Sequence, residues 1–173
     1  MHGRKQPQIA WLTRRMQNIE KTQGFKHVLD IGGGRGDLAV HIAKVFAHVL
    51  VTVVDANEKS LRQGEEFART QGHAISSRIR FICARVTDDF TFEGVQLCDT
   101  AIGRENACSS SNAISTGGID RGGGSSRVEF STVRVDFIVA LHACGGLSDL
   151  AMQVAVLNNC RFLVCPCCYL KNP

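Results

Sequence analysis

The apolar residues of this chain follow two spacings in turn, one typical of helices and one typical of buried strands. Five short apolar runs predict strands at residues 28–31, 49–54, 80–84, 137–141 and 162–165. Helical patterns lie before the first run, after each of the first two runs and between the last two. This alternation predicts an α/β fold, in which helices cover a parallel sheet and the crossovers are right-handed.

The predicted helices are defined by their apolar faces. The face of the first helix comprises Ile9, Leu12, Met16 and Ile19, and that of the second comprises Leu38, Ile42, Val45 and Phe46. A further helix is predicted at residues 59–70, and the last one follows the fourth strand, with apolar positions from Leu147 to Leu157. We expect Ser148 to cap this last helix at its N-terminus, with Asp149 in the first turn.

One segment interrupts the alternation. Residues 103–127 contain six glycines and six serines among 25 residues and almost no apolar side chain. This composition predicts a disordered insertion in the place of the helix between the third and fourth strands. That helix is then either reduced to the residues around Val95 and Leu97 or missing.

Composition and charge place the chain in a broad class. Its 173 residues fit one domain, residues 1–173, and 44% of them are hydrophobic, as in a globular protein. Eight cysteines without an apolar signal segment indicate reduced thiols, so we expect a cytoplasmic or nuclear protein. Residues 1–18 are basic and acid-free, which leaves a mitochondrial presequence as an alternative. No apolar run reaches the length of a membrane span, and the net charge of +4 tolerates a nucleic acid partner without requiring one.

The stretch HVLDIGGGRGDL, residues 27–38, carries the clearest chemical signal. Four glycines, Gly32, Gly33, Gly34 and Gly36, lie between a predicted strand and a predicted helix. Residues without a Cβ let a ligand lie directly on the backbone, next to the free N–H groups at the helix start. The sequence therefore predicts a loop that holds a nucleotide-like ligand.

Two cofactor classes fit this loop. The spacing Gly34-x-Gly36-x-x-Ala39 satisfies the dinucleotide fingerprint, which indicates an NAD-type cofactor. The spacing Asp30-x-Gly32-x-Gly34-x-Gly36 resembles motif I of S-adenosylmethionine-dependent methyltransferases. We favour the second alignment, because an acidic residue closes the strand and the glycines alternate.

Further candidates follow from position, since ligands of open α/β sheets bind outside the carboxyl ends of the strands. Asp55 ends the second strand nineteen residues after Gly36, where its carboxylate can accept hydrogen bonds from ribose hydroxyls of either cofactor. We expect Asp30 to hold the loop and to face the cofactor's ammonium group. Asn57 would close over the adenosine, and Asp88 would accept a hydrogen bond from the adenine amine. Each of these side chains also fits a turn or helix-capping role.

His27 and Asp136 lie at the opposite, amino ends of their strands. We therefore expect them to be surface or capping residues rather than parts of the site.

Two later motifs should meet at the carboxyl edge of the sheet. They are HACG, residues 142–145, and CPCCY, residues 165–169. With the glycine loop they resemble a subgroup of methyltransferase domains that includes glutathione S-transferase C-terminal domain-containing proteins and is distantly similar to a tRNA ribose-O-methyltransferase family. The resemblance implies a Rossmann-like sheet of order 3-2-1-4-5. A methyltransferase sheet usually carries two further strands, which this sequence, ending at Pro173, apparently lacks, so we expect the fifth strand at an exposed edge.

Three roles are open for this second cluster. His142, with Cys144 beside it, could serve on the substrate side, where an imidazole would act as a general base. His142 and the thiols of Cys144, Cys165, Cys167 or Cys168 could instead bind zinc. Cysteines could also simply pack the strand ends under the cofactor. Because C-x-C-C is not a usual zinc spacing, we assign no metal ligand and take His142 and Cys144 as the catalytic candidates.

These features together predict a methyltransferase that uses S-adenosylmethionine. The resemblance implies RNA, and tRNA in particular, as a substrate. Two alternatives remain: a module that binds S-adenosylmethionine without catalysis, and an NAD-type oxidoreductase. The sequence does not indicate an oligomeric state.

Overall fold

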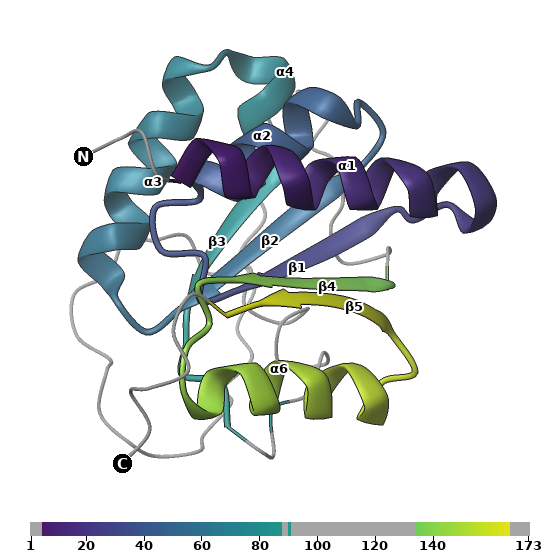
Figure 1. The fold of residues 1–173 in the computed structure, drawn as a ribbon. Helices are drawn as coiled ribbons and strands as arrows, with labels where there is room; N and C mark the ends of the chain where they lie inside the picture. Colours follow the sequence, from purple (N-terminus) through teal and green to yellow (C-terminus); the bar gives the residue numbers. More distant parts are fainter. Residues whose placement is uncertain (1–4, 88–89, 91–133, 167–173) are drawn as a thin grey trace, which may run out of the picture.

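A computed structural model describes residues 5–87, 90 and 134–166 of the chain. Their centre is a five-stranded parallel sheet of order β3-β2-β1-β4-β5, as predicted (Figure 1). The strands are β1 His27–Ile31, β2 Leu50–Asp55, β3 Ile79–Cys83, β4 Phe137–Leu141 and β5 Arg161–Cys165. The helices are α1 Lys5–Gln23, α2 Asp37–Val45, α3 Glu58–Thr70, α4 His73–Ser76 and α6 Gly146–Leu157.

Helices cover the two faces of this sheet and create two apolar cores. Helices α1, α2 and α3 lie on one face, and α6 lies on the other (Figure 1). Side chains of a strand alternate between faces, so the neighbours Val28 and Leu29 of β1 belong to opposite cores. All five residues of β1 and of β4 are buried, as expected for central strands of a parallel sheet. The two cores hold the carboxyl ends of β1, β2 and β4 at one edge, where the site is expected.

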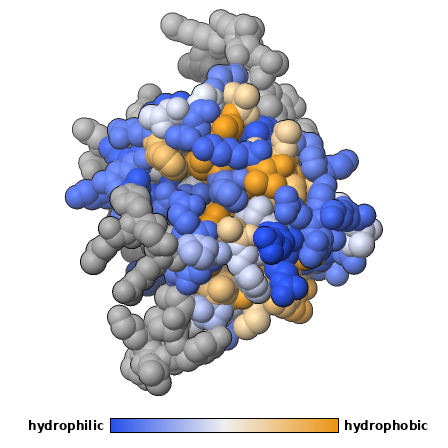
Figure 2. Space-filling model, turned by 45° about the horizontal axis from the view of Figure 1, so that its top comes forward, coloured by the Kyte–Doolittle hydropathy of each residue, from blue (hydrophilic) through white to orange (hydrophobic). Residues whose placement is uncertain are grey.

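The apolar stripe predicted for the first helix is confirmed. Ile9, Leu12 and Met16 are each at most 2% exposed, and Ile19 packs against the same core. The face of the molecule seen in Figure 2 is mostly hydrophilic, with apolar side chains visible in small groups. None of the described helices is long and apolar enough to cross a membrane.

Two predictions about the strand and helix ends are wrong. His27 is fully buried, and its Nε2 forms a hydrogen bond with the Thr52 hydroxyl over 2.8 Å, so it is a core residue. Ser148 is not the N-cap of α6, because the helix begins at Gly146 and Ser148 lies inside its first turn. The Ser148 hydroxyl donates to the Ala143 carbonyl, which precedes the helix. Asp136 does cap a strand end, since its carboxylate accepts hydrogen bonds from the backbone N–H groups of residues 26 and 27.

Several predictions concern residues outside the described part of the chain. They are the disordered insertion at residues 103–127, the reduced helix around Val95 and Leu97, Asp88, and residues 167–169 of the CPCCY motif. Within the described residues β5 pairs with β4 alone and so forms an edge of the sheet, where Phe162 is 43% exposed.

Candidate functional site

The glycine loop connects β1 to α2 and is fixed by three backbone hydrogen bonds. The Gly32 N–H donates to the Val54 carbonyl over 2.8 Å, which ties the loop to β2. The Gly36 N–H donates to the Gly33 carbonyl over 2.9 Å, and the Gly36 carbonyl accepts from Val40 inside α2. Gly36 precedes α2 with a φ of 69°, a left-handed conformation that side chains disfavour. The shape of the loop is therefore defined by its own backbone hydrogen bonds.

Asp55, at the end of β2, connects the loop to the next helix. Its Oδ2 accepts a hydrogen bond from the Gly34 N–H over 2.9 Å, and its Oδ1 accepts one from the Asn57 N–H over 2.8 Å. Asn57 in turn caps α3, because its side-chain oxygen accepts from the Ser60 N–H. Each Asp55 oxygen retains a lone pair for a further donor. The capping role expected as the alternative for Asn57 is thus observed.

Asp30 is the most unusual residue of the site. Its carboxyl is 1% exposed, and neither oxygen has a hydrogen-bond partner within the described residues. Burial and, as the smaller cause, the nearby Asp55 carboxylate raise the pKa of Asp30 to about 8. The carboxyl lies under Gly33, where a Cβ would come within 2.5 Å of Oδ2. Asp55, rather than Asp30, provides the hydrogen bond that holds the loop.

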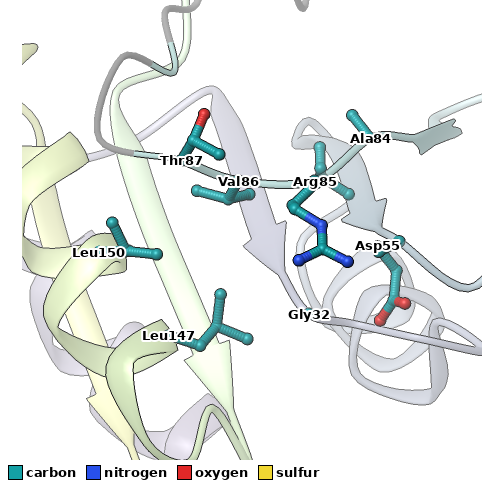
Figure 3. A pocket seen from close by; sticks show the side chains of 10 residues that line it. Gly32, Asp55, Ala84, Arg85, Val86, Thr87, Leu147 and Leu150 are labelled. Atoms are coloured by element: carbon teal, nitrogen blue, oxygen red, sulfur yellow. The ribbon is translucent and has the colours of Figure 1, made fainter. Parts of the chain in front are cut away.

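Two cavities adjoin this loop, and Gly32 lines both. The larger, of about 620 Å³, lies between Asp55, the segment that follows β3 and the start of α6 (Figure 3). The smaller, of about 230 Å³, is lined by Asp30, the glycine loop and His142, with Ile9 of α1 at its side. Both volumes together lie in the range of small-molecule sites, roughly 300–1,000 Å³. The candidate site at the carboxyl edge of the sheet thus comprises two cavities that share Gly32.

His142 follows β4 directly and lines the smaller cavity. Its φ is 63°, rare for a residue with a side chain, and its backbone N–H donates to the Cys165 carbonyl over 3.0 Å. The HACG and CPCCY motifs therefore do meet, through this bond. Cys144 is half-buried and lines neither cavity. Among the residues that the structure describes, no group of three His, Cys, Asp or Glu side chains could hold a metal ion.

Some cavity residues were not predicted from the sequence. Arg85 and Val86 line the larger cavity from the segment after β3, and Leu147 and Leu150 line it from α6. The one sequence feature that could have indicated these four residues is their position shortly after a strand. Arginine, valine and leucine are common on any helix or loop, so their type alone did not single them out. Gly64 of α3 was also missed: a Cβ there would lie 2.6 Å from the Arg35 carbonyl, so a glycine lets α3 approach the loop.

A comparison with family models identifies the fold and the class of site. A model described as a methyltransferase domain matches residues 4–171, which is nearly the whole chain. The chain belongs to this methyltransferase domain family. Membership implies S-adenosylmethionine as the cofactor and decides against the NAD-type alternative. The site fits such a ligand, since the methyltransferase domain offers a glycine loop, a cavity of sufficient size and a buried, unpartnered carboxyl.

Solved structures share the fold of this methyltransferase domain at low sequence identity. M. capricolum TrmK in complex with S-adenosylhomocysteine is 13% identical with a TM-score of 0.51, and the match covers 91% of this chain and 53% of that one. The N-terminal domain of EvdMO1 with S-adenosylhomocysteine bound is 12% identical with a TM-score of 0.51, covering 88% of this chain and 48% of that one. These matches confirm the predicted sheet order.

A curated relative matches over a shorter stretch. The glutathione S-transferase C-terminal domain-containing protein of Mus musculus is 38% identical over 42 residues, which make up 24% of this chain and 7% of that protein. The chain thus spans only part of the lengths of the proteins that it matches.

Proposed function

We propose that this domain transfers the methyl group of S-adenosylmethionine to a nucleophile of RNA. The observation that carries the proposal is the meeting of two cavities at Gly32, one with Asp55 and the other with Asp30 and His142. S-adenosylmethionine has an adenosine half and a charged amino-acid half. It therefore needs two compartments, one on each side of its sulfonium group. The bound cofactor supplies an activated methyl group, and the protein's task is alignment of the acceptor.

We assign the adenosine half to the larger cavity. Its walls are largely apolar, and Asp55, which lines it, has lone pairs left for ribose hydroxyls. Because Asp55 also orders the loop through Gly34, it would couple loop shape to ribose binding. Asn57 would contribute by capping the helix beside it.

We assign the amino-acid half to the loop and Asp30. An ammonium group next to this carboxyl would supply the donor and the positive charge that the described residues do not. The N–H groups at the start of α2 are suited to the carboxylate of the ligand. Burial of an unpartnered acid is destabilising, so a ligand that compensates it gains affinity from the same residue.

We assign the substrate side to His142, with Cys144 two residues on. An imidazole is suited to removing a proton from a hydroxyl or ring nitrogen near neutral pH. The positive φ of His142 and its bond to Cys165 fix the backbone from which the imidazole extends. Cys144 lines neither cavity, so we assign it no contact with the acceptor.

RNA as the acceptor is supported by the motif resemblance and by the outer side of α1. Trp11 is 47% exposed there, with the Arg15 guanidinium 5.4 Å from its ring centre, and Arg14 is exposed beside it. Ile9 of the same helix lines the smaller cavity. Exposed aromatic and basic side chains suit stacking on bases and contact with phosphates. We expect the substrate among cytoplasmic or nuclear RNAs.

The test combines calorimetry with a transfer assay. The protein should bind S-adenosylhomocysteine and not NAD, and should transfer a tritiated methyl group from S-adenosylmethionine into an RNA pool but not into a protein pool. A protein without affinity for S-adenosylhomocysteine would refute the proposal. Binding without transfer to any pool would establish a binding module instead.

A matched variant tests the role of His142. His142→Asn should lower methyl transfer about 10²- to 10⁴-fold, as expected for loss of a general base, with little change in S-adenosylhomocysteine affinity. Asparagine is chosen because it tolerates positive φ. Equal loss of binding and transfer would assign His142 to the cofactor instead.

A further inference from the structure

Arg85 lies on the segment that follows β3 and lines the larger cavity. Its guanidinium extends into the space between Leu147 and Asp55, which line the same cavity (Figure 3). Asp55 and Arg85 are the two charged residues among the described residues that line it. A cation thus enters a cavity whose other lining is mostly apolar.

The described part of the chain gives this guanidinium no ionic partner. Asp55 and Arg85 form no ion pair there, and both Asp55 oxygens already accept backbone hydrogen bonds from Gly34 and Asn57. An arginine on an exposed segment has many solvated conformations available, and side-chain entropy opposes any single one. The orientation of the Arg85 side chain into the cavity is therefore better explained by ligand binding than by a contribution to folding.

The shape of the cavity indicates which part of a ligand the guanidinium would meet. Small apolar residues, Ala84 and Val86, line one side, and Leu147 and Leu150 of α6 line the other (Figure 3). Such walls suit a flat apolar ring. Asp55 fixes where the ribose lies, so the ring next to it is the adenine base.

We propose that Arg85 is a cofactor-positioning residue, whose guanidinium lies against the face of the adenine ring and closes the open side of the larger cavity. The inference rests on the proposed function, because it requires S-adenosylmethionine in this cavity. A planar guanidinium stacks on aromatic faces, which the ammonium of lysine cannot do in the same way. Arg85 then recognises the nucleoside and is indifferent to the amino-acid half of the ligand.

The experiment compares two ligands and four proteins. Affinities for S-adenosylhomocysteine and for adenosine are measured by calorimetry on the full chain, for the wild type, Arg85→Ala, Arg85→Lys and Arg62→Ala. Arg62 is the control, since it is an exposed arginine of α3 whose ion pair with Glu58 lies outside both cavities. Melting temperatures of all four proteins show that each variant is folded.

We expect Arg85→Ala to weaken both ligands by the same factor, about 3- to 10-fold, as for loss of a partly exposed cation–π contact. Arg85→Lys should restore only part of the affinity, and Arg62→Ala should leave it unchanged. Unchanged affinity of Arg85→Ala for both ligands overturns the inference. So does a loss confined to S-adenosylhomocysteine, which would place Arg85 at the ligand carboxylate. A wild-type protein that binds neither ligand refutes the proposed function itself, a result distinct from both.

Discussion

The buried carboxyl of Asp30 should make the protein less stable at neutral pH than it would be with a neutral residue in the same place. Asp30→Asn keeps the size and shape of the side chain but has no proton to release. The variant should therefore be more stable than the wild type near pH 7, in contrast to most substitutions of buried residues.

The size of the effect follows from the pKa of Asp30, which burial raises from 3.8 to about 8. Between these values the native protein keeps a proton that the unfolded chain has released, so stability falls as the pH rises. Each pH unit in this interval costs about 1.4 kcal/mol, and about three such units separate the ordinary value of 3.8 from pH 7. Asp30→Asn should thus gain about 4 kcal/mol at pH 7 and close to nothing near pH 4.

The measurement is urea unfolding of both proteins at pH values between about 4 and about 8. The difference in the free energy of unfolding should grow steadily across this range and level off above about pH 8. Asp149→Asn, which changes an exposed carboxylate in the first turn of α6, is the matched control and should show no such slope. A difference between wild type and Asp30→Asn that stays constant with pH would refute the reasoning.

The same variant should lose affinity for the cofactor. In the proposed site the Asp30 carboxylate faces the ligand's ammonium group, and a charge-assisted contact contributes about 1.5–3 kcal/mol. Asp30→Asn should therefore bind S-adenosylhomocysteine about 10- to 100-fold more weakly while melting at a higher temperature. Calorimetry and thermal unfolding on one preparation test both halves, and retained affinity would show that Asp30 does not meet the ligand.

Three other substitutions separate loop shape, ligand binding and stability. Asp55→Asn should weaken S-adenosylhomocysteine binding about 10- to 100-fold in calorimetry, because it removes a charged acceptor; an unchanged affinity would place the ribose elsewhere. Gly33→Ala should lower both the melting temperature and the affinity, because a Cβ would lie 2.5 Å from the Asp30 oxygen, and overpacking costs about 1–3 kcal/mol. Thr52→Val should cost about 1–3 kcal/mol of stability through the lost bond to His27, with unchanged ligand affinity; a loss of binding would contradict this separation.

The sequence was sufficient for the fold because the strand signals did not depend on tertiary context. The run at residues 49–54 is nearly all apolar and mostly β-branched, and it forms the buried strand β2, shifted by one residue. The prediction that His27 lies at the surface was wrong because the position of a residue along a strand indicates which end it occupies, not whether a helix covers it. Ser148 was misplaced because two glycines, Gly145 and Gly146, begin the helix earlier than the apolar pattern indicates.

The candidate site was predictable only where a residue type and a strand end coincide. Asp30, Asp55 and His142 meet that condition, and the structure places all three around the glycine loop. Arg85 follows β3 just as Asp55 ends β2, but a single arginine in a loop is common on protein surfaces and does not by itself indicate a ligand site. That Asp55 rather than Asp30 holds the loop was also beyond the sequence, because burial and hydrogen bonding of a carboxyl depend on packing.

The difference between Asp55 and Asp30 explains how the glycine loop can be held in one shape and still respond to a ligand. Asp55 accepts two backbone hydrogen bonds, which fix the loop. Asp30 accepts none within the described residues, and both its burial and the Asp55 carboxylate favour its neutral form. Two acidic side chains at one loop thus lie in different surroundings: Asp55 is hydrogen-bonded to the backbone, and Asp30 is buried. A neutral ligand would leave Asp30 protonated. A cationic group beside Asp30 would favour the ionised carboxylate and offset the unfavourable free energy of its burial. In the proposed site, this difference would favour a ligand that carries a positive charge next to an adenosine, which is the combination that S-adenosylmethionine presents.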